Sequence, residues 1–267
     1  MGIINATPDS FSDGSQLNRE DSENFRIDAS KALFKAEAML REGACIVDVG
    51  GESTRPGASK ISAQQQLDRV LPVIEAIRAN LDICISIDSS LPQVMLAAID
   101  AGAEMVNDIR ALSHPEAVAA LAATNAAVCL MHMQGEPGTM QKDFSYQNIV
   151  EEVFQFLEKR VQVCVSNGFG RERLLVDPGF GFGKSLGHNY RLLKELKRFT
   201  SLELPLLVGV SRKSMIGGVV DRPVDGRVAG SIAATSYALL AGANVIRTHD
   251  VAATIDAIRV NSAINDA

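Results

Sequence analysis

Carboxylate and amide side chains end several short apolar runs of this 267-residue sequence, namely Asp88, Asn107, Asp108 and Asp177. If these runs converge, the side chains can accept and donate hydrogen bonds along the N–H and carbonyl edge of a heterocycle. Metal binding is an alternative, although no histidine stands at a coordinating spacing. A second alternative, helix N-capping, stays open for Asp88 and Asp108.

Basic side chains follow two later runs, in the segments Ser211–Gly217 and Arg247–Asp250. They predict a local cluster of positive charge in a chain whose formal net charge is −6. Such a cluster suits a phosphate group, because guanidinium and ammonium groups bind phosphate oxygens through charge-assisted hydrogen bonds. A solvated basic surface is the alternative. The side chains concerned are Arg212, Lys213, Arg247 and His249.

Two early segments, 5–14 and 48–57, are long and polar and follow apolar runs. The amide oxygen of Asn5 suits an Mg²⁺ ion bound to phosphate. The adjacent Gly50 and Gly51 allow close approach of the backbone to a ligand. Thr54 and Arg55 add a hydroxyl and a planar guanidinium that favour an anion.

The segment Asp177–Ser185 nearly matches a nucleotide-binding P-loop. Pro178 stands where that motif requires its first glycine, so we predict no P-loop. Phe180 and Phe182 alternate with glycines and are predicted to be exposed rings that cover something flat.

Short β-like runs alternate with helical patterns along the whole chain. Four glycines (43, 102, 168 and 242) each stand between a helical pattern and the next run, as helix-terminating glycines do. The runs predicted as strands are Gly2–Asn5, Cys45–Val49, Ile83–Ile87, Glu104–Asn107, Ala127–Met131, Leu174–Val176, Leu206–Val210 and Asn244–Arg247. The predicted helices cover about 22–42, 62–80, 92–101, 115–124, 147–167, 188–198, 226–241 and 251–264.

Eight strand–helix units in a chain of this length favour a single-domain α/β fold over residues 1–267, a (β/α)₈ TIM barrel. A polar residue stands at or next to the carboxyl end of every predicted strand. A barrel brings all eight strand ends to one mouth, whereas the alternative, a doubly wound open sheet, uses mainly its switch point.

Composition excludes several classes of protein. No apolar run is long enough to span a membrane, and no signal peptide is recognisable. The acidic balance argues against a nucleic-acid-binding module. Cys45, Cys84, Cys129 and Cys164 form no Cys-x-x-Cys pair and are predicted to be small buried hydrophobes with free thiols. We expect a cytoplasmic protein.

Seven segments together resemble the dihydropteroate synthase family of pterin-binding TIM barrels, and the resemblance spans essentially the whole chain. The segments are Asn5–Gly14, Asp48–Gly57, Asn107–Arg110, Met131–Met133, Asp177–Lys184, Ser211–Gly217 and Arg247–Asp250. The resemblance implies a transferase of folate biosynthesis. It would condense 6-hydroxymethyl-7,8-dihydropterin diphosphate with p-aminobenzoate, require Mg²⁺ and be a target of sulfonamides. A homodimer is also implied.

The same resemblance implies roles for individual residues. The pterin would be bound by Asp88, Asn107, Met131, Asp177, Lys213 and Arg247. The diphosphate would be bound by Asn5, Thr54, Arg247 and His249, with the metal at Asn5. The p-aminobenzoate would be framed by Phe11, Arg55, Pro56, Phe182, Lys213 and Ser214, while Asp13 helps to close the first loop. The catalytic set would be Lys213, Arg247, Asp88 and Asp177.

The family usually carries a β-hairpin before its first strand, and we expect that hairpin to be absent here. Two alternative functions remain open. One is a methyltetrahydrofolate-dependent methyltransferase, which binds a similar ring but no diphosphate. The other is a non-catalytic pterin-binding paralogue.

Overall fold

The computed structural model describes residues 1–7, 17, 27–53, 61–135, 140 and 144–267, and these contain eight strands. Each strand overlaps a predicted run, with β2, β3 and β4 shifted by one residue and β7 and β8 only two residues long. The strands are β1 (Gly2–Asn5), β2 (Ile46–Gly50), β3 (Cys84–Asp88), β4 (Met105–Asp108), β5 (Ala127–Met131), β6 (Leu174–Asp177), β7 (Leu207–Val208) and β8 (Val245–Ile246).

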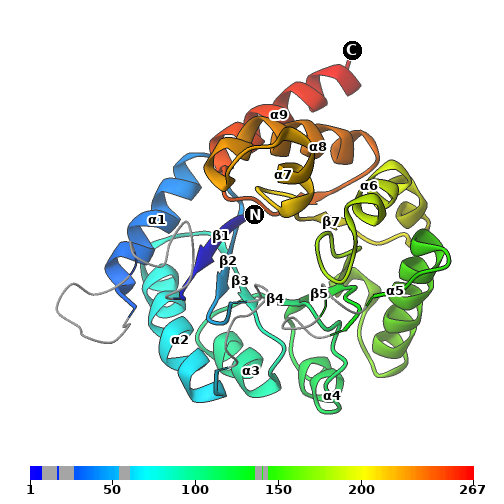
Figure 1. Cartoon of the computed structure of the whole chain (residues 1–267). Coiled ribbons are helices and arrows are strands. Elements are labelled where there is room, and N and C mark those ends of the chain that lie inside the picture. The colour runs from blue at the N-terminus through cyan, green and yellow to red at the C-terminus, as the bar shows by residue number, and fades with distance from the viewer. Residues whose placement is uncertain (8–16, 18–26, 54–60, 136–139, 141–143) are drawn as a thin grey trace.

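The strands form a closed circle through two parallel sheets. Strands β1 to β6 pair in chain order, and β7 pairs with β8. Single parallel bridges join the sheets, Gly2 to Thr248 at one junction and Val176 to Leu206 at the other. Figure 1 shows the helices arranged around these strands. The predicted (β/α)₈ barrel is confirmed, with closure resting on isolated bridges, and the open-sheet alternative is wrong.

The described chain contains nine α-helices, one more than predicted. The additional helix, α7, lies where we expected only a loop. Gly217 and Gly218 lower its helix propensity, while burial of Met215 and Ile216 stabilises it. The helices are α1 (Ala29–Arg41), α2 (Ala63–Asn80), α3 (Pro92–Asp100), α4 (Ala117–Ala122), α5 (Ile149–Ser166), α6 (Leu186–Lys194), α7 (Ser214–Val220), α8 (Val228–Leu240) and α9 (Val251–Asn265).

Capping residues fix where several helices begin and end. Asp28 accepts the N–H groups of Ser30 and Lys31 at the start of α1. Ser62 and Ser185 form capping boxes at the starts of α2 and α6. The four glycines predicted to terminate helices all have positive φ angles, between 95° and 111°.

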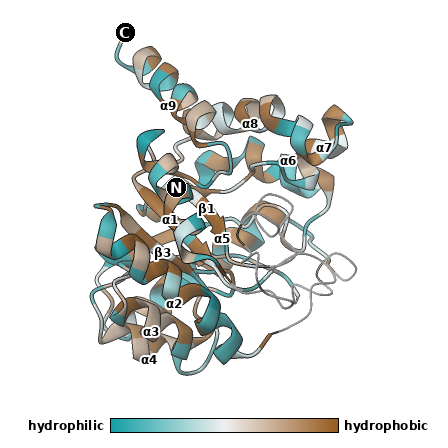
Figure 2. Ribbon diagram, turned by 90° about the vertical axis from the view of Figure 1, so that its left-hand side faces the viewer, coloured by the Kyte–Doolittle hydropathy of each residue, from teal (hydrophilic) through white to brown (hydrophobic). Residues whose placement is uncertain are grey.

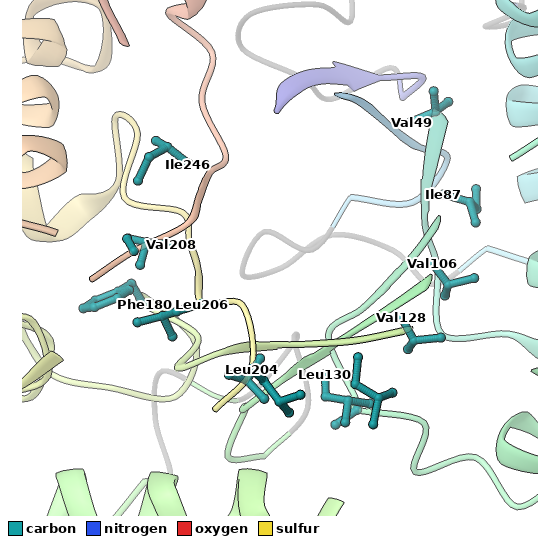
Figure 3. Packing of buried hydrophobic residues seen from close by; sticks show 14 of the residues in the cluster. Val49, Ile87, Val106, Val128, Leu130, Phe180, Leu204, Leu206, Val208 and Ile246 are labelled. Carbon is teal, nitrogen blue, oxygen red and sulfur yellow. The ribbon is translucent and has the colours of Figure 1, made fainter. Parts of the chain in front are cut away.

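Side chains along each strand alternate between two hydrophobic layers. The larger layer packs between the strands and the helices, and it includes Val49, Ile87, Val106 and Val128. Figure 3 shows these side chains pointing away from the centre of the ring. A smaller cluster, centred on Met105, Cys129 and Leu207, fills the inside of the barrel at the amino ends of the strands. The carboxyl ends carry polar side chains instead.

The helices carry hydrophilic and hydrophobic residues together (Figure 2), as helices with one face on a core do. No helix in the described ranges is long and apolar enough to cross a membrane. All four cysteines are free thiols. Cys129 and Cys164 are buried as predicted, and Cys84 is only partly buried. Cys45, just before β2, is exposed, so that prediction is wrong.

Candidate active site

A polar pocket lies at the carboxyl ends of the strands. It brings together eight side chains that the sequence singled out: Asn5, Asp88, Asn107, Met131, Asp177, Phe182, Lys213 and Arg247. Thr7, Glu52, Ser53, Ile109 and Gly209 complete the described lining. Because the strands are parallel and in register, Asp88 on β3 pairs with Asn107 on β4, and Met131 on β5 pairs with Asp177 on β6.

Arg247 is held at the bottom of this pocket by two carboxylates. Its Nε donates to Oδ2 of Asp48 at 2.6 Å, and its terminal nitrogen donates to Oδ2 of Asp88 at 2.9 Å. The side-chain amide of Asn107 donates to the same oxygen of Asp48 at 3.0 Å. Asp48 is fully buried. The sequence analysis assigned it no binding role, although a carboxylate within an otherwise apolar strand was the signal that could have found it.

Burial and neighbouring charges shift the pKa values of this cluster. The pKa of Asp88 is raised to about 7, first by burial and then by Asp48, while Arg247 opposes the shift. Burial also raises the pKa of Asp177, opposed by Lys213 and by the Gly179 N–H. The pKa of Lys213 is lowered to about 8, chiefly by burial, with Asp177 acting in the other direction. The pocket therefore holds titratable groups poised near neutral pH.

Lys213 faces the β6–α6 loop, residues 178–185. Its Nζ donates to the carbonyl of Phe180 at 2.5 Å and lies 4.8 Å from the centre of the Phe182 ring. The Phe182 ring lines the pocket. The Phe180 ring is fully buried in the hydrophobic core, so the prediction that it is exposed is wrong.

Three predicted residues lie outside the described lining of the pocket. Arg212 forms an ion pair with Asp250, with N–O distances of 3.0 and 2.5 Å, and lies within 3.3 Å of Asp225. Its expected place in the cation cluster is therefore wrong, because its charge is directed at these carboxylates. His249 has its Nδ1 3.1 Å from the hydroxyl of Ser211. Ser214 is exposed at the first residue of α7.

Five other predicted site residues, Phe11, Asp13, Thr54, Arg55 and Pro56, lie outside the described residues. Among the described residues, no group of three or more His, Cys, Asp or Glu side chains is arranged to hold a metal ion. The metal-site alternative for the strand-end carboxylates thus gains no support from their geometry. Asp108 instead stabilises the loop that follows β4, because its carboxylate accepts hydrogen bonds from the N–H groups of Arg110 and Leu112 at 2.9 and 2.7 Å.

Comparisons with known proteins agree with this geometry. The family model described as "Pterin binding enzyme" matches residues 1–249. The dihydropteroate synthase of Haemophilus influenzae is 51% identical over 260 residues, which cover 97% of this chain and 91% of the relative. The Escherichia coli K12 dihydropteroate synthase is 48% identical and covers 97% and 89%.

Solved structures extend the likeness to three dimensions. The Yersinia pestis dihydropteroate synthase, solved with a sulfonamide drug complex, is 45% identical with a TM-score of 0.94, covering 100% of this chain and 94% of that chain. The Xanthomonas albilineans enzyme in complex with 7,8-dihydropteroate is 39% identical with a TM-score of 0.86, covering 100% and 93%. The chain belongs to the pterin-binding enzyme family and, within it, to the dihydropteroate synthases.

Proposed function

We propose that the residues around the barrel mouth carry out the synthase reaction in distinct roles. As a dihydropteroate synthase, the protein is a transferase that joins 6-hydroxymethyl-7,8-dihydropterin diphosphate to p-aminobenzoate. The products are 7,8-dihydropteroate and pyrophosphate. The observation that carries the assignment is the arrangement of Arg247 and Lys213 among the buried carboxylates of one pocket.

The pterin ring is proposed to lie deepest in the pocket, on Met131. Its N–H groups donate to the carboxylates of Asp88 and Asp177, and the Asn107 amide supplies both a donor and an acceptor. Lys213 donates to a ring oxygen or nitrogen, and Arg247 stacks on the ring. A buried polar site that pairs with each ring edge rejects analogues that leave one of its groups unpaired.

The diphosphate is proposed to bind towards Asn5, Arg247 and His249, together with Thr54. Negative charge builds on it as the C–O bond to the pterin methylene breaks. Fixed cations stabilise that charge most in the transition state and thereby lower the barrier. The methylene becomes electron-poor, the amine nitrogen of p-aminobenzoate forms the new C–N bond, and its proton passes to solvent.

Mg²⁺ fits this site as a partner of the substrate. The ion commonly keeps several waters and binds through one or two protein oxygens plus substrate phosphates. Asn5 supplies such an amide oxygen at the end of β1, in the lining of the pocket. When bound, the ion would neutralise charge on the departing diphosphate.

The p-aminobenzoate is proposed to lie towards the mouth, framed by Phe182, Lys213 and Ser214 together with Phe11, Arg55 and Pro56. Asp13 is proposed to help the first loop to close. The Xanthomonas albilineans enzyme has been solved with 4-aminobenzoic acid, and the Yersinia pestis enzyme with a sulfonamide drug complex. These relatives support a shared subsite, and sulfonamides are expected to compete for it here.

We also propose a homodimer in the cytoplasm. Helices α6 to α8 expose large apolar side chains, including Leu186, Val219, Tyr237 and Leu240. Exposed apolar patches of this kind commonly mark protein interfaces. The four free thiols suit a reducing compartment.

An omission experiment tests the function. Purified protein is incubated with the pterin diphosphate, p-aminobenzoate and Mg²⁺, and dihydropteroate is followed by mass spectrometry. We expect product only when both substrates are present. A methyltransferase would instead consume methyltetrahydrofolate, and a non-catalytic paralogue would bind pterin without forming product.

A further inference from the structure

The β6–α6 loop has a buried lysine that no role above uses. Lys184 is 3% exposed, and its Nζ lies beneath the loop rather than in the pocket. Burial lowers the pKa of this amine well below its ordinary value. Its Nζ donates to the carbonyls of Gly179 at 2.8 Å and Phe182 at 2.9 Å. It also reaches His132 at the end of β5, 2.9 Å from Nδ1 and 3.3 Å from the carbonyl. The Lys184 side chain thus connects two carbonyl groups of the loop to the residue that follows β5.

His132 is suited to accept from this lysine. The ring is 6% exposed and packs edge-on against Phe156, with centroids 4.9 Å apart. Its pKa is lowered to about 2, first by burial and then by Lys184, so the imidazole is neutral and Nδ1 can serve as an acceptor.

The backbone of the loop passes too close to residues 132–134, just after β5, for a side chain to fit between them. Gly179 and Gly183 have positive φ angles of 73° and 60°. A Cβ at Gly179 would lie 1.9 Å from the carbonyl oxygen of His132, and one at Gly183 would lie 2.3 Å from that of Gln134. Carbonyls turned inward in such a loop require donors, because an unpaired buried carbonyl is costly. Lys184 supplies these donors.

The loop in turn contacts Lys213 on its other side. The Phe180 carbonyl accepts from Lys213 Nζ, and the Phe182 ring lies beneath the same nitrogen. Gly181 lies against the Lys213 chain, since a Cβ there would be 3.3 Å from its Cδ. The path from Lys184 to the pocket therefore runs through three consecutive loop residues.

We propose that Lys184 is a positioning residue of the synthase, which fastens the β6–α6 loop to His132 so that Phe182 and Lys213 are held in place for the aryl amine. The proposal rests on the assignment of Phe182 and Lys213 to p-aminobenzoate made above. It predicts a larger effect for p-aminobenzoate than for the pterin diphosphate, because Phe182, the loop side chain that lines the pocket, is assigned to p-aminobenzoate alone. Of the residues assigned to the pterin, Asp88, Asn107, Met131 and Arg247 come from other strand ends. The loop contacts the other two, Asp177 and Lys213, through one backbone hydrogen bond each.

The test compares Lys184→Met with Lys197→Met, which makes the same substitution at an exposed site. For Lys184→Met, we expect kcat/KM for p-aminobenzoate to fall roughly 10- to 100-fold, as loss of alignment does. The KM for the pterin diphosphate should change by less than about threefold, and Lys197→Met should match the wild type. Calorimetry with the pterin diphosphate alone should give nearly unchanged affinity. If Lys184→Met does not fold, the same measurements are made on Lys184→Gln. Its side chain keeps a hydrogen-bond donor but is too short to reach His132.

A double variant separates positioning from general loss of stability. In a Phe182→Ala background, Lys184→Met should add little further loss, because both changes act through the same ring. Wild-type kinetics in Lys184→Met, equal losses for both substrates, or full additivity with Phe182→Ala would overturn the proposal. Wild-type KM for p-aminobenzoate in Phe182→Ala would instead contradict the subsite assignment on which it rests.

Discussion

Two cations, Lys213 and Arg247, share the pocket with Asp88 and Asp177, and Asp48 lies buried beneath them. Both cations line the pocket, where a polyanionic substrate can reach them. Within the protein, Arg247 pairs with two carboxylates and Lys213 donates to a backbone carbonyl. Fixed, largely buried cations do not need to reorganise when charge develops on the leaving group. The chemistry therefore depends on side chains that support one another across the barrel.

The substitution Asp48→Asn should weaken the anchoring of Arg247. The substitution removes a charge that pairs with Arg247 inside the barrel, so we expect the free energy of unfolding to fall by about 3 kcal/mol. Turnover should fall at least tenfold, because Arg247 loses its anchor. Urea denaturation and steady-state kinetics measure the two effects. Asp82→Asn, at an exposed residue before β3, is the matched control. Wild-type stability and turnover in Asp48→Asn would contradict the role of this pair.

The pH dependence of kcat/KM for the pterin diphosphate should be bell-shaped. It should rise as Asp88 ionises near its raised pKa of about 7 and fall as Lys213 deprotonates near its lowered pKa of about 8. Stability follows from the same shifts. Because folded Asp88 holds its proton up to about pH 7 rather than its ordinary 3.8, its contribution to stability declines as the pH rises through that window.

Rate profiles from pH 5 to 10 check this expectation. Lys213→Arg should move the alkaline limb upward, since guanidinium keeps its proton. A profile that stays flat across neutral pH would contradict the assignment of both groups.

The β6–α6 loop requires glycine where its backbone passes close to residues 132–134. Gly179→Ala should cost activity and stability, because the new Cβ would meet the His132 carbonyl oxygen at 1.9 Å and φ is 73°. Gly168→Ala shares the strain of a positive φ, 95°, but its Cβ would have no described atom within 4 Å.

We therefore expect Gly168→Ala to lower the free energy of unfolding by about 1–2 kcal/mol and to leave the kinetics normal. Gly179→Ala should lower the free energy of unfolding further and should also reduce activity. Thermal unfolding and kcat/KM for p-aminobenzoate distinguish the two variants. Equal effects would show that backbone strain alone, and not contact with β5, explains these glycines.

The strands and their common mouth could be predicted from the sequence, whereas the partners of individual side chains could not. Polar strand ends and terminating glycines are local signals, so the eight strands and their common mouth were predictable. The partners of side chains were not. Phe180 turns into the core, Arg212 pairs with Asp250, and α7 forms despite two glycines. Those outcomes depend on contacts between segments far apart in the chain, which local patterns do not contain.

At the scale of the whole molecule, the barrel leaves helices α6 to α8 with an exposed apolar face. Leu240 and Val219 are each more than three-fifths exposed, at 64% and 62%. If this face joins two copies, Leu240→Glu should shift the mass measured by light scattering from dimer towards monomer. Val260→Glu, at an equally exposed residue of α9, is the control and should remain dimeric. A monomeric wild-type protein would contradict the proposed homodimer.

We infer that this pocket performs the synthase reaction and that Lys213 is one of the groups that contact the reacting substrates. The most direct measurement is pyrophosphate release from the pterin diphosphate in the presence of p-aminobenzoate and Mg²⁺, by the wild type and by Lys213→Ala. We predict release by the wild type that depends on both substrates, and a loss of at least about 100-fold in Lys213→Ala with its circular dichroism and melting transition retained. Release at the wild-type rate by Lys213→Ala would contradict the role of Lys213, and no release by the wild type would contradict the assigned reaction.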